Sequence, residues 1–231
     1  MRKFINILVI MITIILIGID LMFAILPNIR LNTIFIIGCF ATPTILIFIT
    51  MIVQIRLEDE REEKDKIRNF WLKTVFIVYC VLLICILFLN NEYRTNRTMQ
   101  FSFDKLFSEE HLEINNIVPF GTLSSYIYKM ANHRINTNIV LVNVVVNLVL
   151  LMPMGFFVPM LFKEKIKNTK QFLLLILGTT LSIEILQFFT FSGTFDVDDI
   201  ILNTIGAIIV YLLMKNKIIK TIMNKLFDLS K

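Results

Sequence analysis

The stretch SIEILQFFTFSGTFDVDDIILNTIGAIIVY, residues 182–211, decides the fold of this chain. It predicts an apolar helix, a short turn with the acidic residues Asp196, Asp198 and Asp199, and a second apolar helix. A charged side chain at the centre of a membrane helix costs roughly 2.5 kcal/mol or more, so such groups face a protein interior or a water-filled cavity. We therefore expect this hairpin to hold a polar site inside a membrane protein.

The composition indicates an all-α, polytopic helical membrane protein. Of the 231 residues, 56% are hydrophobic, the mean hydropathy is +0.75, and the apolar residues occur in long blocks. A soluble protein interrupts its apolar runs every few residues, so that class is excluded. The net charge is +5, but the basic residues form no stripe on a soluble face, which excludes a nucleic-acid partner. The expected partner is the lipid bilayer.

Six apolar runs predict about six transmembrane helices. The first run follows a basic start like that of a signal peptide, but it is too long and no small-residue cleavage site closes it. Basic residues concentrate at the amino terminus, in the 56–69 and 163–170 loops and in the tail, which fall on one side of a six-span protein. The positive-inside rule then places both termini in the cytoplasm. The predicted spans are residues 4–26, 34–55, 70–89, 139–162, 171–191 and 199–214.

We expect four regions along the chain. The segment INNIVPFGTL (114–123) is an apolar and aromatic patch followed by the amphipathic SSYIYKM, so its surroundings are not a simple linker. A re-entrant or an interfacial segment has this pattern. The regions are an N-terminal three-helix membrane region (1–89) with the charged cytoplasmic loop 56–69, an extracytoplasmic loop (90–138), a membrane core (139–214) and a basic cytoplasmic tail (215–231).

Polar residues recur at helical spacing within three of the predicted spans. Residues three or four apart share a helix face. With a rise of about 1.5 Å per residue, Glu184 lies roughly 10 Å and Asn147 roughly 12 Å below the outer ends of their spans. Similar depth on three helices predicts an outward-facing polar pocket, covered by the 90–138 loop. Its residues are Asn143, Asn147, Glu184, Gln187, Asp196, Asp199 and Asn203.

Each of these residues also has a simpler explanation. Asn143 and Asn203 can hold a bundle together by hydrogen bonds between helices, at around 0.6 kcal/mol each. Asp196 and Asp198 can be solvated at the interface, and an acidic residue such as Asp199 is favourable at a helix amino terminus. Glu184 is harder to explain in this way, because a carboxylate at that depth requires a partner or a proton.

The sequence predicts no cofactor, no metal site and no catalytic residue. Cys39, Cys80 and Cys85 lie inside apolar runs, and the absence of a CxxC pair or a Cys/His cluster excludes a thiolate zinc site. We interpret these cysteines as free packing residues. His111 and His133 lie in the long loop without a second ligand at metal spacing, so we interpret them as ordinary loop histidines.

Three motifs together resemble the VanZ-like family over residues 114–214. They are NIVPF (116–120), the pattern N-x3-N-x5-P-x-G-x3-P from Asn143 to Pro159, and E-x2-Q followed by F-D-V-D-D-I-x2-N-x2-G. Many members carry a basic residue just before the acidic turn, where this chain has Ser192-Gly193-Thr194. The resemblance implies a structural role for six motif residues: Pro119, Phe120, Pro153, Gly155, Pro159 and Gly206.

The resemblance implies a role at the bacterial cell envelope. The member that gives the family its name is linked to low-level resistance to teicoplanin, a lipid-tailed glycopeptide that binds cell-wall precursors. For this chain it implies a protein of the cytoplasmic membrane that acts at the outer leaflet, with a cell-wall precursor or a lipoglycopeptide as ligand. The resemblance does not imply an established enzyme activity.

Two other functions compete with this hypothesis. A membrane enzyme acting on a lipid-linked substrate would use Glu184 as general base and Asp199 with Asn203 as a metal site. The missing nucleophile and the missing His or Cys cluster argue against it. A small transporter is less favoured, because the two halves of the sequence show no internal repeat.

Overall fold

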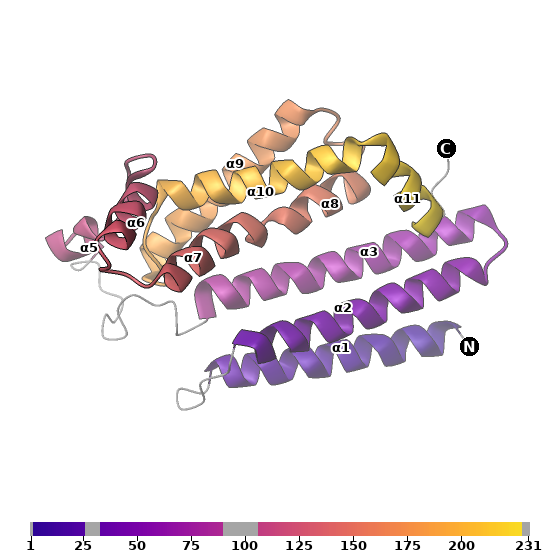
Figure 1. The fold of residues 1–231 in the computed structure, drawn as a ribbon. Helices are drawn as coiled ribbons and strands as arrows, with labels where there is room; N and C mark the ends of the chain where they lie inside the picture. Colours follow the sequence, from indigo (N-terminus) through magenta and orange to yellow (C-terminus); the bar gives the residue numbers. More distant parts are fainter. Residues whose placement is uncertain (1, 26–32, 90–105, 228–231) are drawn as a thin grey trace. The chain divides into compact units, whose positions relative to one another are not determined.

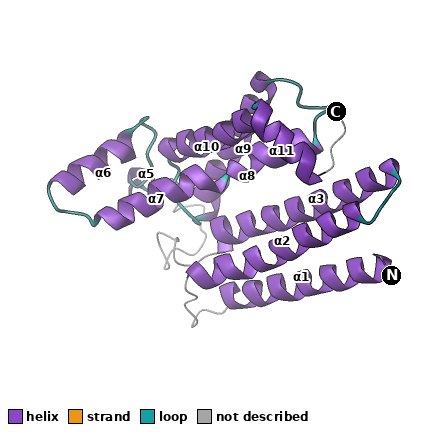
Figure 2. Cartoon of the chain, turned by 45° about the vertical axis from the view of Figure 1, so that its right-hand side comes forward, coloured by secondary structure: helices purple, strands orange, loops and turns teal. Residues whose placement is uncertain are grey.

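The computed structural model describes residues 2–25, 33–89 and 106–227. Within these ranges the regular elements are helices, and Asn116 and Asp196 form an isolated parallel β-bridge. The chain divides into two compact units, one formed by residues 1–91 with 217–231 and the other by residues 92–216. The all-α class predicted from composition is confirmed for the described part of the chain (Figures 1 and 2).

The first unit contains the three N-terminal helices and the C-terminal helix. Within the described residues, the predicted runs 4–26, 34–55 and 70–89 fold as helix. The third helix begins at Arg61, because the charged segment before Phe70 is helical too. The helices are α1 (Arg2–Ile25), α2 (Thr33–Arg56), α3 (Arg61–Ile84), its continuation as a short π-helix η1 (Cys85–Leu89), and α11 (Lys217–Phe227).

A row of hydrogen-bonded side chains crosses the apolar interior of this unit. The indole N–H of Trp71 donates to Oε1 of Gln54 (3.1 Å), and Nε2 of Gln54 donates to Oδ1 of Asn6 (2.7 Å). These residues belong to α3, α2 and α1, so the two hydrogen bonds connect all three helices. The buried amide is thereby satisfied on both sides, which removes the cost of an unpaired polar group in an apolar surrounding.

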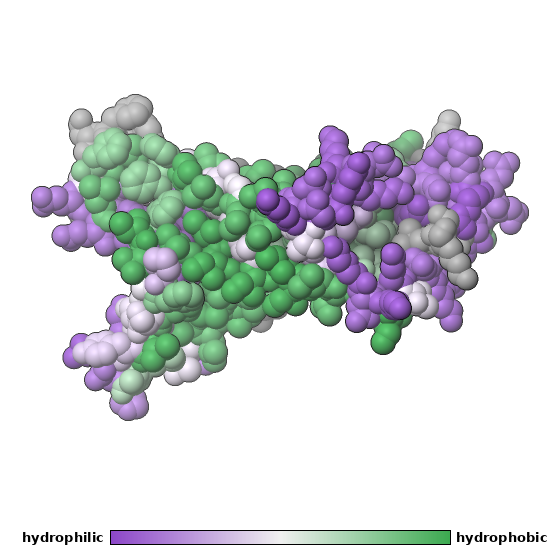
Figure 3. Space-filling view, turned by 90° about the horizontal axis from the view of Figure 1, so that it is seen from above, coloured by the Kyte–Doolittle hydropathy of each residue, from purple (hydrophilic) through white to green (hydrophobic). Residues whose placement is uncertain are grey.

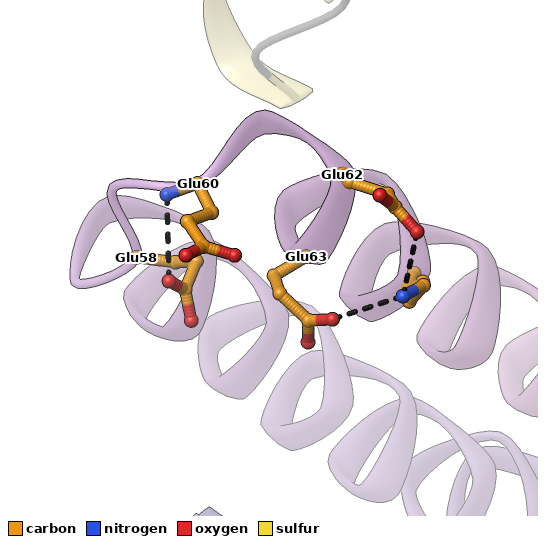
Figure 4. Close-up of polar contacts among 5 residues, drawn as sticks. Glu58, Glu60, Glu62 and Glu63 are labelled. Carbon is orange, nitrogen blue, oxygen red and sulfur yellow. Dashed lines mark hydrogen bonds and ion pairs between the residues drawn. The ribbon is translucent and has the colours of Figure 1, made fainter.

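The turn between α2 and α3 is densely acidic, as Figure 4 shows. The backbone N–H of Glu60 donates to the side chain of Glu58 (3.4 Å). Lys66 pairs with Glu62 (2.8 Å) and Glu63 (3.0 Å) on the first turns of α3. Exposed pairs of this kind contribute little stability, so the segment acts as a solvated charged connection.

The second unit is organised around its last helix, α10, which packs against the three helices before it and contacts α6. Helices α7 and α8 follow one another along α10 in Figures 1 and 2. The helices are α5 (Glu109–Glu113), α6 (Gly121–Ala131), α7 (Thr137–Leu150), α8 (Met152–Leu161), α9 (Thr169–Thr190) and α10 (Val197–Lys215).

The predicted span 139–162 is interrupted at Leu151, which separates α7 from α8. Pro153 lies in the first turn of α8, where its missing N–H leaves no helical bond unmade. In a continuous helix the same proline would remove a bond and clash with a carbonyl one turn earlier. Pro159 lies inside α8. The predicted single span is therefore built from two helices with a break between them.

Two glycines allow α10 to approach α7 and α8 at backbone distance. A Cβ atom added to Gly206 would lie 1.7 Å from the carbonyl oxygen of Leu148 on α7. A Cβ atom added to Gly155 would lie 2.4 Å from the carbonyl oxygen of Ala207 on α10. Small residues permit such close packing of membrane helices. Both motif glycines therefore set the helix contacts on which the site depends.

Four helices in the described ranges are long and apolar enough to cross a membrane. Along α9 many large hydrophobic side chains are exposed, and Figure 3 shows hydrophobic residues over the middle of the helices with hydrophilic residues toward the ends. Shorter apolar stretches occur at 4–16 in α1 and 44–56 in α2. The count of six spans and the orientation of the termini stay predictions. The four candidates are Arg61–Phe88, Thr137–Leu161, Thr169–Thr190 and Val197–Lys215.

Candidate functional site

The acidic turn before α10 is held by the segment that precedes α6. The backbone N–H of Asn116 donates to the carbonyl of Phe195 (2.8 Å), and the N–H of Val197 donates to the carbonyl of Asn116 (2.9 Å). The side chain of Asn115 accepts a further bond from the N–H of Phe195 (2.6 Å). Two motifs about eighty residues apart in sequence thus form one structure.

Asp196 is the N-cap residue of α10 and is buried. Its carboxylate accepts hydrogen bonds from the backbone N–H of Asp198 (2.8 Å), the amide of Asn116 (2.8 Å) and the hydroxyl of Thr122 (2.6 Å). The capping role that the sequence suggested for Asp199 therefore belongs to Asp196. The alternative that Asp196 is a solvated interfacial residue is wrong.

Asp198 is also buried, with 1% of its surface exposed, so it is not solvated either. Its two carboxylate oxygens accept hydrogen bonds from the backbone N–H groups of Phe120 and Leu123 (2.9 Å for the latter). These groups lie at the amino terminus of α6, where the helix dipole favours a negative charge. Phe120 itself adopts the left-handed conformation, with φ 63°. Asp198 thus fixes the start of α6, a role that the sequence did not predict.

Two further carboxylates complete the acidic site. Glu184 lies in the last third of α9, and Asp199 lies in the first turn of α10. Glu184 is 3% exposed, and its Oε2 accepts a bond from the backbone N–H of Asp196 (3.0 Å). Oδ1 of Asp199 accepts a bond from the amide of Asn147 on α7. The second oxygen of each carboxylate accepts no hydrogen bond from the residues that the structure describes.

The remaining predicted pocket residues lie around this pair in different ways. The amide of Asn143 donates to the hydroxyl of Tyr126 on α6 (3.0 Å). The amide of Asn203 donates to the backbone carbonyl of Asp199 (2.9 Å), and its Oδ1 is buried without a partner among the described residues. Gln187 lies against Gly193 of the turn and forms no side-chain hydrogen bond with the described carboxylates.

The site is acidic and lacks a counter-charge within the described ranges. None of the carboxylates of Glu184, Asp196, Asp198 and Asp199 forms an ion pair there. Ionised carboxylate oxygens only accept hydrogen bonds, so the group that completes such a site is a donor, such as an ammonium or a hydroxyl. The arrangement favours binding of a donor-rich polar group.

The sequence missed the contribution of the segment before and within α6. Its members are polar residues that looked like ordinary loop residues because their partners lie far along the chain. Asn116 stands at the start of the NIVPF motif, which is the signal that could have identified it. Pro119 and Phe120 of the same motif are exposed. The missed residues of this segment are Asn115, Asn116, Thr122 and Tyr126, and their counterpart in α10 is Asp198.

Tyr126 has a changed acidity in this position. Burial raises the pKa of the Tyr126 hydroxyl above its ordinary value, and the negative charges of Asp199 and Asp196 raise it further. The hydrogen bond from Asn143 acts in the opposite direction but is the smaller influence than burial. The hydroxyl therefore stays protonated beside the acidic cluster.

His111 is not a loop histidine in solvent. Its ring is 1% exposed and lies between Phe188 (centroids 4.7 Å apart) and Phe191 (4.5 Å). His133 is exposed and has φ 51°. No group of three or more His, Cys, Asp or Glu residues in the described part is arranged to hold a metal ion.

Two of the three cysteines can be located. Cys80 and Cys85 are half-buried, in α3 and η1, and neither forms a disulfide with a described residue. The side chain of Cys39 lies outside the described part of α2. Both are therefore thiols and not half-cystines, as the sequence indicated.

Comparison with known proteins connects this geometry to a family. A family model described as VanZ/LLP1 matches residues 76–220, more than half of the chain and more than the 114–214 that the motifs covered. The match includes every helix from α5 to α10, and thus the whole acidic site. No curated protein and no solved structure matches the chain. The chain belongs to the VanZ/LLP1 family.

Proposed function

We propose that this chain is a multi-pass protein of the bacterial cytoplasmic membrane with six spans and both termini in the cytoplasm. The four long apolar helices and the helical α1 and α2 support this number. The concentration of Lys and Arg at the amino terminus, in two short loops and in the tail supports the orientation. The acidic site then faces outward, toward the cell wall.

Within this topology the site binds the polar part of an amphiphilic ligand at the outer leaflet. The ligand is a lipid-tailed glycopeptide such as teicoplanin, or a lipid-linked cell-wall precursor. One observation carries this proposal: Glu184 and Asp199 each keep one carboxylate oxygen without a hydrogen bond from the described residues. An ammonium or hydroxyl group of the ligand would satisfy these oxygens.

The four acidic residues have different parts in this proposal. Both carboxylate oxygens of Asp196 and both of Asp198 accept hydrogen bonds from the segment 116–123, so these two residues build the site. Glu184 and Asp199 contact the ligand, and Asn147 positions Asp199. The exposed apolar side chains of α9 next to Glu184, such as Ile185 and Phe189, provide a surface along which a lipid tail can lie.

Antibiotic susceptibility tests the proposal directly. A sensitive Gram-positive host expresses the natural chain, Asp199→Asn or Asp59→Asn at matched membrane levels. Asp199→Asn keeps an acceptor for Asn147 but removes the charge, whereas Asp59 lies in the exposed turn outside the family match. We expect tolerance to teicoplanin, but not vancomycin, to rise with the natural chain and Asp59→Asn and to be lost with Asp199→Asn. Equal tolerance in all three strains and the empty host would overturn the proposal.

The membrane enzyme is the second candidate, and the burial of Glu184 is the observation that favours it. A buried carboxylate near a polar site can act as a general base. Its test is turnover of a labelled undecaprenyl-linked substrate by the purified chain and by Glu184→Gln. Turnover that requires Glu184 would favour the enzyme over a binding protein.

A further inference from the structure

Helix α11 separates its residues cleanly into two faces. At 100° per residue, Lys217, Lys220 and Lys225 fall on one side together with Thr221 and Asn224. The opposite side carries the apolar residues Ile218, Ile219, Ile222, Met223, Leu226 and Phe227. A short helix with a basic face and an aliphatic face is typical of a segment that lies at a membrane surface.

One edge of the apolar face packs against other helices of the first unit. Phe227 is buried, its ring lies 6.2 Å from that of Phe48 on α2, and its carbonyl accepts a bond from Arg68 of α3 (3.5 Å). Ile219 and Met223, which share this edge, are half-buried. These contacts fix how α11 is turned about its own axis.

The other edge of the apolar face is exposed. Ile222 and Leu226 lie one turn apart and are 49% and 44% exposed, and Ile218 one turn earlier is exposed as well. Each turn of the helix contributes one side chain to this edge, and Lys225 lies beside it. A row of three side chains is far smaller than the roughly 800 Å² per partner that a stable protein interface buries. A lipid surface suits its size and its charged border better.

The end of the second unit that precedes α11 is also basic. Nζ of Lys215, the last residue of α10, donates to the hydroxyl of Thr169 (2.9 Å) and lies 4.4 Å from the ring centroid of Tyr211. This bond places the end of α10 beside the start of α9, next to the basic loop 163–170. Only Asn216 separates α10, a candidate span, from α11. The basic helix therefore begins where a span leaves the membrane.

We propose that α11 binds the anionic headgroups of the membrane that α10 crosses. Lys217, Lys220 and Lys225 contact the lipid phosphates, and Ile222 and Leu226 enter the boundary with the acyl chains. The inference rests on the membrane embedding of α10 and is independent of the ligand of the acidic site. Each basic residue near an anionic surface increases binding about fivefold.

The test places a fluorescent label on each face of α11 in the full-length chain. Cys39, Cys80 and Cys85 are replaced by serine, and bimane is attached to Ile222→Cys or, as the matched control, Thr221→Cys on the exposed polar face. The protein is held in nanodiscs of phosphatidylcholine alone or mixed with phosphatidylglycerol. Quenching is measured with lipids that carry a nitroxide near the headgroup and with iodide in solution. Emission of Trp71 reports whether each variant keeps the packing of the first unit.

We expect the label at 222 to be quenched by the nitroxide lipids, more strongly in the anionic discs, and to be shielded from iodide. The label at 221 should be quenched by iodide instead. Replacing Lys217, Lys220 and Lys225 by glutamine should remove the extra quenching in anionic discs. High salt should remove it in the unsubstituted chain, which keeps the test valid if the triple variant misfolds.

Three outcomes would overturn the proposal. Equal access of iodide to positions 222 and 221 would show that α11 does not lie on lipid. Shielding of position 222 from iodide without quenching by lipid would show that protein, such as a second copy of this chain, covers the edge. Lipid quenching that is the same in both discs and insensitive to salt would show that headgroup charge is not recognised.

Discussion

The carboxylate of Asp198 in the first turn of α10 accepts a hydrogen bond from the backbone N–H of Phe120, the residue that precedes α6. A second bond from Leu123 uses its other oxygen. These bonds satisfy donors at the start of α6 that have no partner within that helix. In the same turn, the carboxylate of Asp196 accepts a bond from the amide of Asn116, and the backbone N–H of Asp196 donates to Glu184. The segment before α6 and the acidic site therefore form one connected structure.

Asp198→Asn should loosen the start of α6. The substituted amide retains one acceptor oxygen, so one of the two backbone N–H groups loses its partner and the other loses a charged one. Loss of a hydrogen bond to a buried charged group costs about 1–3 kcal/mol. Hydrogen exchange of the amides at 120–123 should become faster, while amides in the middle of α9 should be unaffected.

The control for this measurement is Asp59→Asn in the exposed turn between α2 and α3. It removes the same charge and should leave exchange at 120–123 unchanged. Protection of these amides that is equal in Asp198→Asn and in the natural chain would contradict the role assigned to Asp198.

The positions of the helices could be predicted from the sequence because hydrophobicity acts locally. The runs that became α9 and α10 differ from their predicted bounds by only a few residues. The break at Leu151 was not predicted, because Pro153 is compatible both with a kink inside one helix and with the first turn of a new helix. The outcome depends on packing against α10, which a local pattern does not contain.

The site could be predicted in part. Helical spacing predicted that Asn147, Glu184 and Asp199 lie at similar depth on three helices. In the structure, hydrogen bonds join Asn147 to Asp199 and Glu184 to the backbone of Asp196. The roles of Asp196 and Asp198 were not predictable from spacing, because their partners lie in a segment more than seventy residues earlier. Short polar side chains reveal a role only when the long-range partner is known.

Thr122→Val should destabilise the acidic turn, and Thr122→Ser should not. The hydroxyl of Thr122 donates to Oδ2 of Asp196 (2.6 Å), and valine has nearly the same shape without a donor. A buried carboxylate oxygen that loses a donor costs about 1–3 kcal/mol. Thermal unfolding in detergent should show a lower midpoint for Thr122→Val, with Thr122→Ser close to the natural chain. A midpoint that is equally lowered by serine would mean that the methyl group, and not the hydroxyl, matters.

Gly206→Ala should disturb the contact between α10 and α7, whereas Gly178→Ala should be tolerated. The new methyl at 206 would overlap the carbonyl of Leu148, and moving a backbone or overpacking a tight contact costs about 1–3 kcal/mol. Gly178 in α9 has no heavy atom within 4 Å of an added Cβ, and alanine is the better helix former there by about 0.5–1 kcal/mol. The thermal midpoint should fall for Gly206→Ala and stay level or rise for Gly178→Ala. Equal effects of the two substitutions would contradict the close approach at Gly206.

The Tyr126 hydroxyl should make the stability of the chain depend on alkaline pH. Because burial, with Asp199 and Asp196, raises its pKa, the folded chain keeps this proton where the unfolded chain has lost it. The resulting stabilisation is complete below the ordinary tyrosine pKa of about 10 and declines as the pH rises above it. The stability difference between the natural chain and Tyr126→Phe should therefore shrink above about pH 10. The tyrosinate absorbance of Tyr126 is the difference between the natural chain and Tyr126→Phe, and it should appear only above the pH range in which tyrosine ordinarily ionises. Its appearance within or below that pH range would show that the hydroxyl is not buried beside the acidic site.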